Sequence, residues 1–304
     1  MTDGADTSTP QSGPRLGRLV TAMVTAFADD GSLDLDGVRR LATELVDDQA
    51  NDALVVNGTT GESPTTTEDE KFATVTATLE AVGDRATIIA GVGSFDTAHT
   101  VRMARRAADV GAHALLVVTP YYSKPVQQGI EAHFRAVADA TDLPVMVYDI
   151  PGRTGVPIAP ETLVSLAEHP NIVAVKDAKG DIVSSSAVMA ATDLDYYAGD
   201  DAITLPLLSV GGVGVVGTST HFTGRGMREL IDAALANDWA HALEVHRRWL
   251  PAFTGVFAAP GCCMVKAGLE LAGRGVGPVR LPMVAPDDAV VREFLAKVHT
   301  AAQG

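Results

Sequence analysis

Short apolar runs rich in β-branched residues alternate with longer stretches of helical periodicity through most of this chain of 304 residues. Such alternation is typical of consecutive strand–helix units on a parallel sheet. Helical patterns fill every gap between the runs, most cleanly at residues 97–110 and 127–141, and residues 225–236 close the eighth unit. The eight predicted strands are residues 19–25, 53–57, 87–92, 114–119, 145–150, 172–177, 196–199 and 214–218.

The number of these units selects one fold class. Eight units that end near residue 238 match the roughly 250-residue scale of a (β/α)8 barrel, whereas a doubly wound sheet would more usually stop at about five or six strands. We therefore expect an α/β fold, a catalytic (β/α)8 TIM barrel over residues 16–238. Residues 239–304 have the pattern of about three helices, broken at Pro260 and Gly261 and by the Gly- and Pro-rich stretch 273–286, so we expect a C-terminal helical appendage.

The charge balance and the cysteine count exclude several classes of protein. Lysine and arginine number 23 against 38 acidic residues, and a net charge of −15 would repel the phosphate backbone of a nucleic acid. The two cysteines, Cys262 and Cys263, are adjacent and are not expected to bridge, which suits a reducing cytoplasm. No apolar run approaches the roughly 18 residues of a membrane span. Residues 1–15 are polar and predict a disordered tail rather than a signal peptide.

The active site of such a barrel forms where the strands end, so the residues at the strand ends are the candidates for chemistry. Five of the predicted strands carry reactive side chains or Gly-flanked turns there. These segments are Gly58-Thr59-Thr60-Gly61-Glu62-Ser63, Thr119-Pro120-Tyr121-Tyr122, Tyr148-Asp149-Ile150-Pro151-Gly152-Arg153, Lys176 itself, and Gly199-Asp200-Asp201.

Lys176 is the candidate nucleophile because it follows four apolar residues, 172–175, within a predicted buried strand. An ammonium in that position must be paired, hydrated or partly deprotonated. A desolvated lysine has a lowered pKa and can attack a carbonyl carbon to form an imine. The alternative is an ion pair with Asp149, Asp177 or Asp200 near the barrel mouth, and the residues alone leave both interpretations open.

The chain offers few rival lysines. Lys124 and Lys179 follow strands in predicted loops, so we expect both to be solvated. The six lysines are Lys71, Lys124, Lys176, Lys179, Lys266 and Lys297.

The turn at residues 58–63 offers two hydroxyl groups and several backbone N–H groups that can cradle a carboxylate. The alternative is an ordinary helix start, with Ser63 or Thr67 as the N-cap and Glu70 completing a capping box with Thr67. Tyr121 and Tyr122 can relay protons beside a barrel mouth, or they can simply pack at a subunit interface. Neither pair of alternatives is decided by the residues.

Other candidate groups are weaker. Arg153 suits bidentate capture of a carboxylate, although taken alone an ordinary surface arginine is the default interpretation. Asp200 and Asp201 favour a helix N-cap over a metal site, and the eight histidines form no ligand pattern, so we expect no metal. Residues 212–217 spell G-x-G-x-x-G, but their valines form the eighth strand, which argues against a dinucleotide site.

These five segments resemble the pyruvate-dependent class I aldolases and lyases and, within that superfamily, the 4-hydroxy-tetrahydrodipicolinate synthases, also called dihydrodipicolinate synthases. The resemblance covers residues 16–304, and the segments occur in the family's order and approximate spacing. Two positions depart from the family pattern, Ala26 in place of the usual Pro and Gly217 in place of a frequent Ser. Both shape the backbone and leave the chemistry intact.

The resemblance implies a role for each catalytic candidate. Lys176 would form a Schiff base with pyruvate, and Tyr148 would shuttle protons during imine formation and later steps. Thr59 and Tyr122 would complete the proton relay. In that family the second tyrosine reaches the active site of a neighbouring subunit, so Tyr122 implies a homo-oligomer, expected to be a tetramer built as a dimer of dimers.

The resemblance also implies the substrates. Thr60 and the backbone near Val216 would hold pyruvate, and Arg153 would grip the carboxylate of L-aspartate 4-semialdehyde. The implied enzyme is a cytoplasmic lyase in the first committed step of diaminopimelate and lysine biosynthesis. It needs no metal or organic cofactor because the lysine itself is the electron sink.

Sibling enzymes keep an alternative open. N-acetylneuraminate lyase and 2-keto-3-deoxygluconate aldolase share the lysine and the tyrosine, so Lys176 and Tyr148 indicate the reaction type and not the substrate. Arg153 and Thr60 favour the synthase. A catalytically silent paralogue with a binding role would lose the lysine or the tyrosines, and none is lost.

Overall fold

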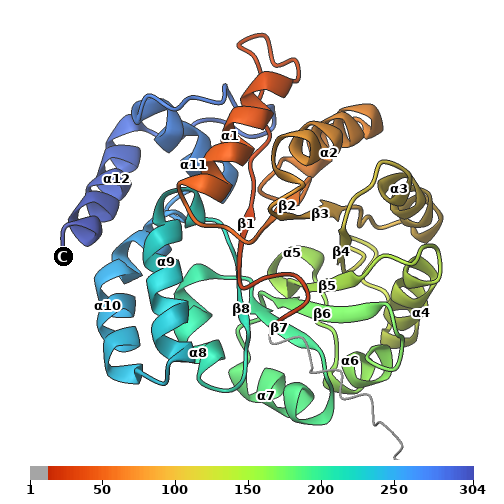
Figure 1. The fold of residues 1–304 in the computed structure, drawn as a ribbon. Helices are drawn as coiled ribbons and strands as arrows, with labels where there is room; N and C mark the ends of the chain where they lie inside the picture. Colours follow the sequence, from red (N-terminus) through yellow and green to blue (C-terminus); the bar gives the residue numbers. More distant parts are fainter. Residues whose placement is uncertain (1–12) are drawn as a thin grey trace, which may run out of the picture.

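Eight parallel strands close into a barrel in which every strand pairs with its neighbours in the chain and β1 pairs with β8 (Figure 1). The computed structural model describes residues 13–304, so most of the tail predicted at residues 1–15 lies outside the described residues. The predicted (β/α)8 fold is confirmed. The strands are β1 Leu19–Ala22, β2 Ala53–Val56, β3 Thr87–Gly91, β4 Ala114–Val118, β5 Val145–Asp149, β6 Ile172–Asp177, β7 Asp195–Ala198 and β8 Gly214–Gly217.

Helices cover the outside of this barrel (Figure 1). Those between strands are α1 Leu35–Asp47, α2 Glu68–Val82, α3 Thr97–Asp109, α4 Gln127–Ala138, α5 Pro151–Thr154, α6 Pro160–Leu166, α7 Ile182–Ala191 and α8 Thr204–Leu208, with short 3-10 turns η1 Ser63–Thr65 and η2 Asp201–Ile203. After β8 come α9 Thr220–Leu235, α10 Trp239–Gly255, α11 Gly261–Leu271 and α12 Asp288–Ala302.

The start predicted for the helix after β8 was wrong. The helix begins at Thr220, five residues before the predicted 225. Its first turn is polar in sequence, yet His221 and Thr223 are fully buried there, and the His221 ring accepts a hydrogen bond from the Val24 backbone N–H. Apolar periodicity does not reveal such a turn, because its residues are buried through hydrogen bonds.

Strand residues are buried on both faces, as in other barrels with an outer layer of helices. One face packs against the helices, and the other fills the barrel interior with residues such as Val20, Ile89, Met146 and Ala174. Because side chains alternate along a strand, Lys176 faces inward, two residues beyond Ala174. The barrel interior therefore carries an amine near the carboxyl end of β6.

The three helices predicted for residues 239–304 are present as α10, α11 and α12, separated at residues 256–260 and 272–287. They lie together on one side of the barrel, drawn in blue in Figure 1. Met227 of α9 belongs to the same apolar cluster as Val245 and Phe253 of α10, so α10 packs onto the outer helical layer. The boundary predicted at residue 238 remains a prediction. Among the described residues, no helix combines the length and the hydropathy needed to cross a membrane.

Candidate active site

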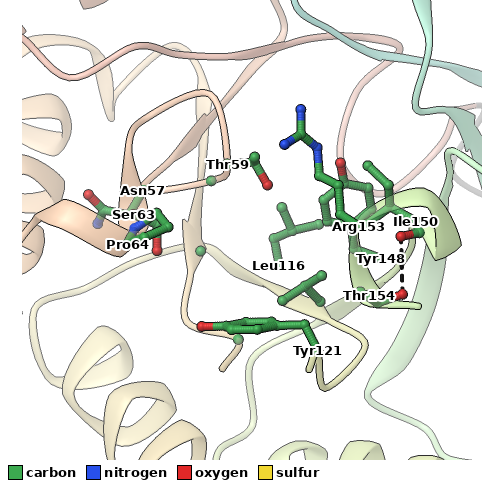
Figure 2. A pocket seen from close by; sticks show the side chains of 14 residues that line it. Asn57, Thr59, Ser63, Pro64, Leu116, Tyr121, Tyr148, Ile150, Arg153 and Thr154 are labelled. Atoms are coloured by element: carbon green, nitrogen blue, oxygen red, sulfur yellow. Dashed lines mark hydrogen bonds between the residues drawn. The ribbon is translucent and has the colours of Figure 1, made fainter. Parts of the chain in front are cut away.

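Two adjacent cavities open at the carboxyl ends of the strands. The larger has a volume of about 200 Å³ and the smaller about 80 Å³, and both are lined by Thr59, Tyr148, Ile150 and Arg153. Figure 2 shows the larger cavity, with Tyr148 and Arg153 on one side and Ser63 on the other. The strand ends thus bring together residues from several units, as the sequence predicted for this face of a barrel.

Lys176 lines the smaller cavity with its side chain directed inward from β6. Only 5% of the residue is exposed, and burial lowers the pKa of its amine to about 8, with the Arg153 charge acting in the same direction and the Asp201 carboxylate opposing it. Within residues 13–304 no carboxylate forms an ion pair with Lys176, whereas Lys266 has one. The structure therefore favours the nucleophile interpretation over the ion pair.

Tyr148 stands beside Lys176 on the neighbouring strand. The two residues are register partners of β5 and β6, and the Lys176 Nζ atom lies 4.3 Å from the centre of the Tyr148 ring. Burial raises the pKa of the Tyr148 phenol to about 12, against the opposing effects of the Arg153 charge and of the nearby Thr59 hydroxyl. The phenol therefore keeps its proton near neutral pH and can donate it to a neighbouring oxygen.

The turn at residues 58–63 borders both cavities. Thr59 lines each of them, and the Thr60 hydroxyl lies in the smaller one, 3.5 Å from the Thr218 hydroxyl at the end of β8. The helix α2 starts farther on, where Thr67 and Glu70 form the predicted capping box. The capping box is therefore confirmed, and because it uses other residues than the turn, binding of a carboxylate at residues 58–63 remains a prediction.

Arg153 follows β5 in the short helix α5 and lines both cavities. It is exposed, but its side chain lies at the rim rather than in bulk solvent, and Figure 2 shows it beside Tyr148. A guanidinium at this rim can bind a carboxylate through two parallel hydrogen bonds. The structure therefore places the arginine where a substrate carboxylate can reach it.

Comparisons with known proteins establish the family of this chain. A model of the dihydrodipicolinate synthetase family matches residues 15–301. The chain belongs to this family. It is 62% identical to the 4-hydroxy-tetrahydrodipicolinate synthase of Cutibacterium acnes over 283 residues, which cover 93% of this chain and 97% of that protein. It is 61% identical to the corresponding synthase of Acidothermus cellulolyticus, covering 92% of each.

Solved structures of the same family share the fold. Dihydrodipicolinate synthase from Cyanidioschyzon merolae, crystallised with lysine bound, superimposes with a TM-score of 0.92 at 39% identity, covering 94% of this chain and 98% of that one. The enzyme from Bacillus anthracis gives a TM-score of 0.91 at 38% identity, covering 94% and 99%. The predicted family is thus confirmed by sequence and by structure.

Two residues predicted from the family resemblance lie outside both cavities. Tyr122 is 93% exposed and has a left-handed backbone with φ of 71°, while its neighbour Tyr121 lines the larger cavity and packs edge-on against Phe95. Val216 is fully buried in β8, and it is Thr218, two residues later, that reaches the smaller cavity. The catalytic role of Tyr122 and the binding role of Val216 remain predictions.

The two aspartates that follow β7, Asp200 and Asp201, make different contacts. Asp200 caps η2 by accepting a hydrogen bond from the Ala202 N–H, as predicted for a helix start. Asp201 is fully buried and accepts hydrogen bonds from the Thr218 N–H at 3.0 Å and from the Ser219 N–H and hydroxyl at 3.1 and 2.6 Å. Its carboxylate fixes the end of β8 and acts electrostatically on Lys176. Sequence analysis missed this role, because it depends on contacts between neighbouring strands.

The prediction for Lys179 was wrong. Only 14% of its side chain is exposed, and its Nζ lies 3.8 Å from the Asp149 carboxylate and donates to the Ser184 hydroxyl at 3.1 Å. The turn at Gly180 and the start of α7 bring the lysine back over β5, which a sequence pattern does not show. Lys124 is exposed, as predicted.

The C-terminal segment lines part of the smaller cavity, which the sequence analysis did not predict. Five of its residues line the smaller cavity opposite the strand ends, with no motif to signal it. They are Phe257, Pro260, Gly261, Cys262 and Met283. The two cysteines are free and buried, with Sγ atoms 3.9 Å apart, as expected. Across residues 13–304, no group of three or more His, Cys, Asp or Glu side chains gathers in a way that would hold a metal ion.

Proposed function

We propose that the protein is a 4-hydroxy-tetrahydrodipicolinate synthase that condenses pyruvate with L-aspartate 4-semialdehyde through an imine on Lys176. The observation that carries this proposal is the buried amine of Lys176, which forms no ion pair with a carboxylate of residues 13–304 and faces a cavity shared with Tyr148, Thr59, Thr60 and Arg153. The 62% identity to a synthase of this name supports the substrate assignment.

The lowered pKa of Lys176 explains why it acts as the nucleophile. With a pKa of about 8, a useful fraction of the amine is neutral near pH 7.5 and can attack the keto carbon of pyruvate. The resulting carbinolamine loses its hydroxyl as water, and a proton must reach that oxygen. Tyr148 keeps its proton up to a pKa of about 12 and therefore serves as the donor, with Thr59 linking it to the next group of the relay.

The second half of the reaction uses the iminium as an electron sink. Its positive nitrogen makes a proton of the pyruvate methyl group acidic, and loss of that proton gives an enamine. The enamine carbon attacks the aldehyde carbon of the semialdehyde, forming a carbon–carbon bond and an alkoxide that takes up a proton. The amino group of the semialdehyde then displaces Lys176 and closes the ring, so one water is released overall. In this proposal the step needs no metal or organic cofactor.

The remaining groups bind the two carboxylates. Thr60 and the backbone at the end of β8, near Val216, hold pyruvate next to Lys176. Arg153 at the rim binds the carboxylate of the semialdehyde, which supports the synthase over aldolases that act on sugar acids.

We further propose that the enzyme works as a homotetramer in the cytoplasm, built as a dimer of dimers. Tyr122 supports this assembly, because it projects away from its own site and is free to enter that of a neighbour.

Borohydride trapping tests the proposed function directly. Incubation with pyruvate and borohydride, followed by peptide mass mapping, is expected to place the reduced adduct on Lys176. Coupled assays would then compare aspartate semialdehyde plus pyruvate with N-acetylneuraminate and with 2-keto-3-deoxygluconate. An adduct elsewhere would contradict the mechanism, and turnover of a sugar acid without the semialdehyde reaction would contradict the substrate assignment.

A further inference from the structure

The turn that carries Thr59 and Thr60 is attached to the C-terminal helices by an ion pair buried from solvent. The Lys266 ammonium, on α11, donates to Glu62 Oε1 at 3.0 Å and to the Pro278 carbonyl at 2.6 Å. Both side chains are only 2% exposed. The two partners are 204 residues apart in sequence, so the contact exists only because the chain folds.

Glu62 has a second partner in the same C-terminal segment. Its Oε2 atom accepts a hydrogen bond from the Arg280 backbone N–H at 2.8 Å, while the Arg280 guanidinium donates to the Thr65 carbonyl at 2.9 Å and to Glu70. Lys266 Nζ and the Arg280 guanidinium both lie against the Phe27 ring, at 4.1 and 4.0 Å from its centre. Both carboxylate oxygens of Glu62 are therefore held from residues 266–280.

The backbone conformation at Glu62 shows why contacts to the C-terminal helices matter for the shape of this turn. Glu62 adopts a left-handed conformation with φ of 55° and ψ of 37°, which is unfavourable for a side chain of its type. Hydrogen bonds from the Gly61, Glu62 and Ser63 N–H groups, at 3.1, 3.2 and 3.4 Å, close the same turn, and only the last exceeds the usual N–H···O range. The contacts from residues 266–280 add to these bonds in holding the left-handed backbone at Glu62.

The buried Glu62–Lys266 ion pair is better explained by the geometry that it imposes than by a gain in stability. Burying two charges costs free energy that their attraction often only balances, so such a pair is a weak source of stability. It does, however, define one geometry. Here that geometry joins the segment that forms the outer wall of the smaller cavity, through Cys262 on α11, to the turn that forms its inner side, through Thr60.

We propose that Glu62 and Lys266 are positioning residues that hold the Thr59 hydroxyl against the Tyr148 phenol by fixing the turn at residues 58–63 to α11. The proposal rests on the proposed function, in which Thr59 belongs to the proton relay. Neither Glu62 nor Lys266 is among the residues that line the two active-site cavities, so in this proposal both act through the turn and not on the substrate.

The test compares Glu62→Gln and Lys266→Met with a control that perturbs a distant carboxylate. Asp52 is suitable, because it binds the Arg18 and Leu19 N–H groups and Arg228 at the opposite end of the barrel. Asp52→Asn should lower Tm without changing kcat. Assayed well below each Tm, Glu62→Gln and Lys266→Met should each lower kcat about tenfold or more while the KM for pyruvate changes less than about threefold.

A double-mutant cycle separates positioning from general loosening. In a Thr59→Val background, Glu62→Gln should cost less than about threefold in kcat, because the hydroxyl that it positions is already absent. An equal loss of kcat in both backgrounds, or a lower Tm with kcat unchanged, would overturn the proposal.

Amide hydrogen exchange provides a readout that does not depend on turnover. Exchange at residues 61–63 should be faster in Glu62→Gln and Lys266→Met than in the unchanged protein, and unaltered in Asp52→Asn. Unchanged exchange at residues 61–63 would refute the positioning role even if the protein lacked synthase activity. If the unchanged protein failed to form the pyruvate adduct while exchange was still faster in the variants, the proposed function would be refuted and the attachment of the turn would stand.

Discussion

The Lys176 ammonium nitrogen lies 4.3 Å from the centre of the Tyr148 ring, and the two residues are register partners on adjacent strands. Burial acts on both groups in the direction that favours their neutral forms, lowering the pKa of the amine and raising that of the phenol. An amine that loses its proton more easily than an exposed lysine therefore lies beside a phenol that remains protonated near neutral pH. The following expectations derive from this pair and from the residues around it.

Imine formation should follow the protonation of Lys176. The rate of pyruvate trapping is expected to rise about tenfold per pH unit below pH 8 and to level off above it, because the neutral amine is the reactive form and its pKa is about 8. The measurement is the initial rate of adduct formation by mass spectrometry across the pH range. A rate that keeps rising steeply beyond pH 9 would show an amine with an ordinary pKa.

Lys176→Met should abolish turnover and stabilise the fold. The folded pKa of about 8 lies below the usual 10.5, so the unfolded state binds more protons between these values and stability rises with pH there. Below pH 8 the buried ammonium costs about 3 kcal/mol at most, which Met removes. Denaturant unfolding at pH 7 should show a gain of about 1–3 kcal/mol that shrinks by pH 10. A destabilised variant would show that the cavity hydrates the ammonium.

Tyr148→Phe keeps the ring beside Lys176 and removes only the phenol. We expect kcat to fall about 10²–10³-fold, because a positioned proton donor typically contributes that much. Adduct formation at Lys176 should slow as well, while Tm changes little because the hydroxyl group is lost at the edge of a cavity. Activity within about threefold of the unchanged enzyme would remove Tyr148 from the relay.

Arg153→Gln should weaken binding of the semialdehyde and spare pyruvate. Loss of a bidentate carboxylate contact is expected to raise the KM for the semialdehyde about 10–100-fold. Steady-state kinetics with each substrate varied in turn would measure both constants. Arg39→Gln is the matched control, because Arg39 pairs with Asp36 and Glu80 on the outer helices. An equal rise in both KM values would argue against a specific role in binding the semialdehyde.

Mixing two inactive variants tests whether Tyr122 serves a neighbouring subunit. Lys176→Met and Tyr122→Phe are each expected to be nearly inactive alone. After co-refolding in equal amounts, about a quarter of the activity per site should return, because half of the dimers pair one protomer of each kind and gain one complete site. No recovery, with mixed oligomers verified by mass spectrometry, would place the role of Tyr122 within its own chain or remove it.

Several features were predictable because they depend on local pattern. The strands were found because residues buried on both faces form continuous apolar runs, and Lys176 was found because a charge interrupts one of these runs. The predicted strands mostly extend one to three residues too far, since the first loop residues, such as Thr119, are also buried.

Other features were not predictable from spacing. Tyr121 and Tyr122 are adjacent, but the left-handed backbone at Tyr122 accompanies a side chain exposed to solvent, while Tyr121 lines the cavity. Lys179 returns over Asp149 because the chain turns at Gly180 before α7 starts at Ile182. Neither outcome follows from which residues are neighbours in the chain.

The amino-acid order by itself determined the barrel, the family and the choice of Lys176 as the candidate nucleophile, because periodicity and short motifs act over a few residues. Only the tertiary structure decided which groups surround that lysine. Asp201, Thr218, Cys262 and the Glu62–Lys266 pair come together through contacts between segments far apart in the chain. The physical reason is that burial and charge depend on distances in space, and closure of the barrel sets those distances.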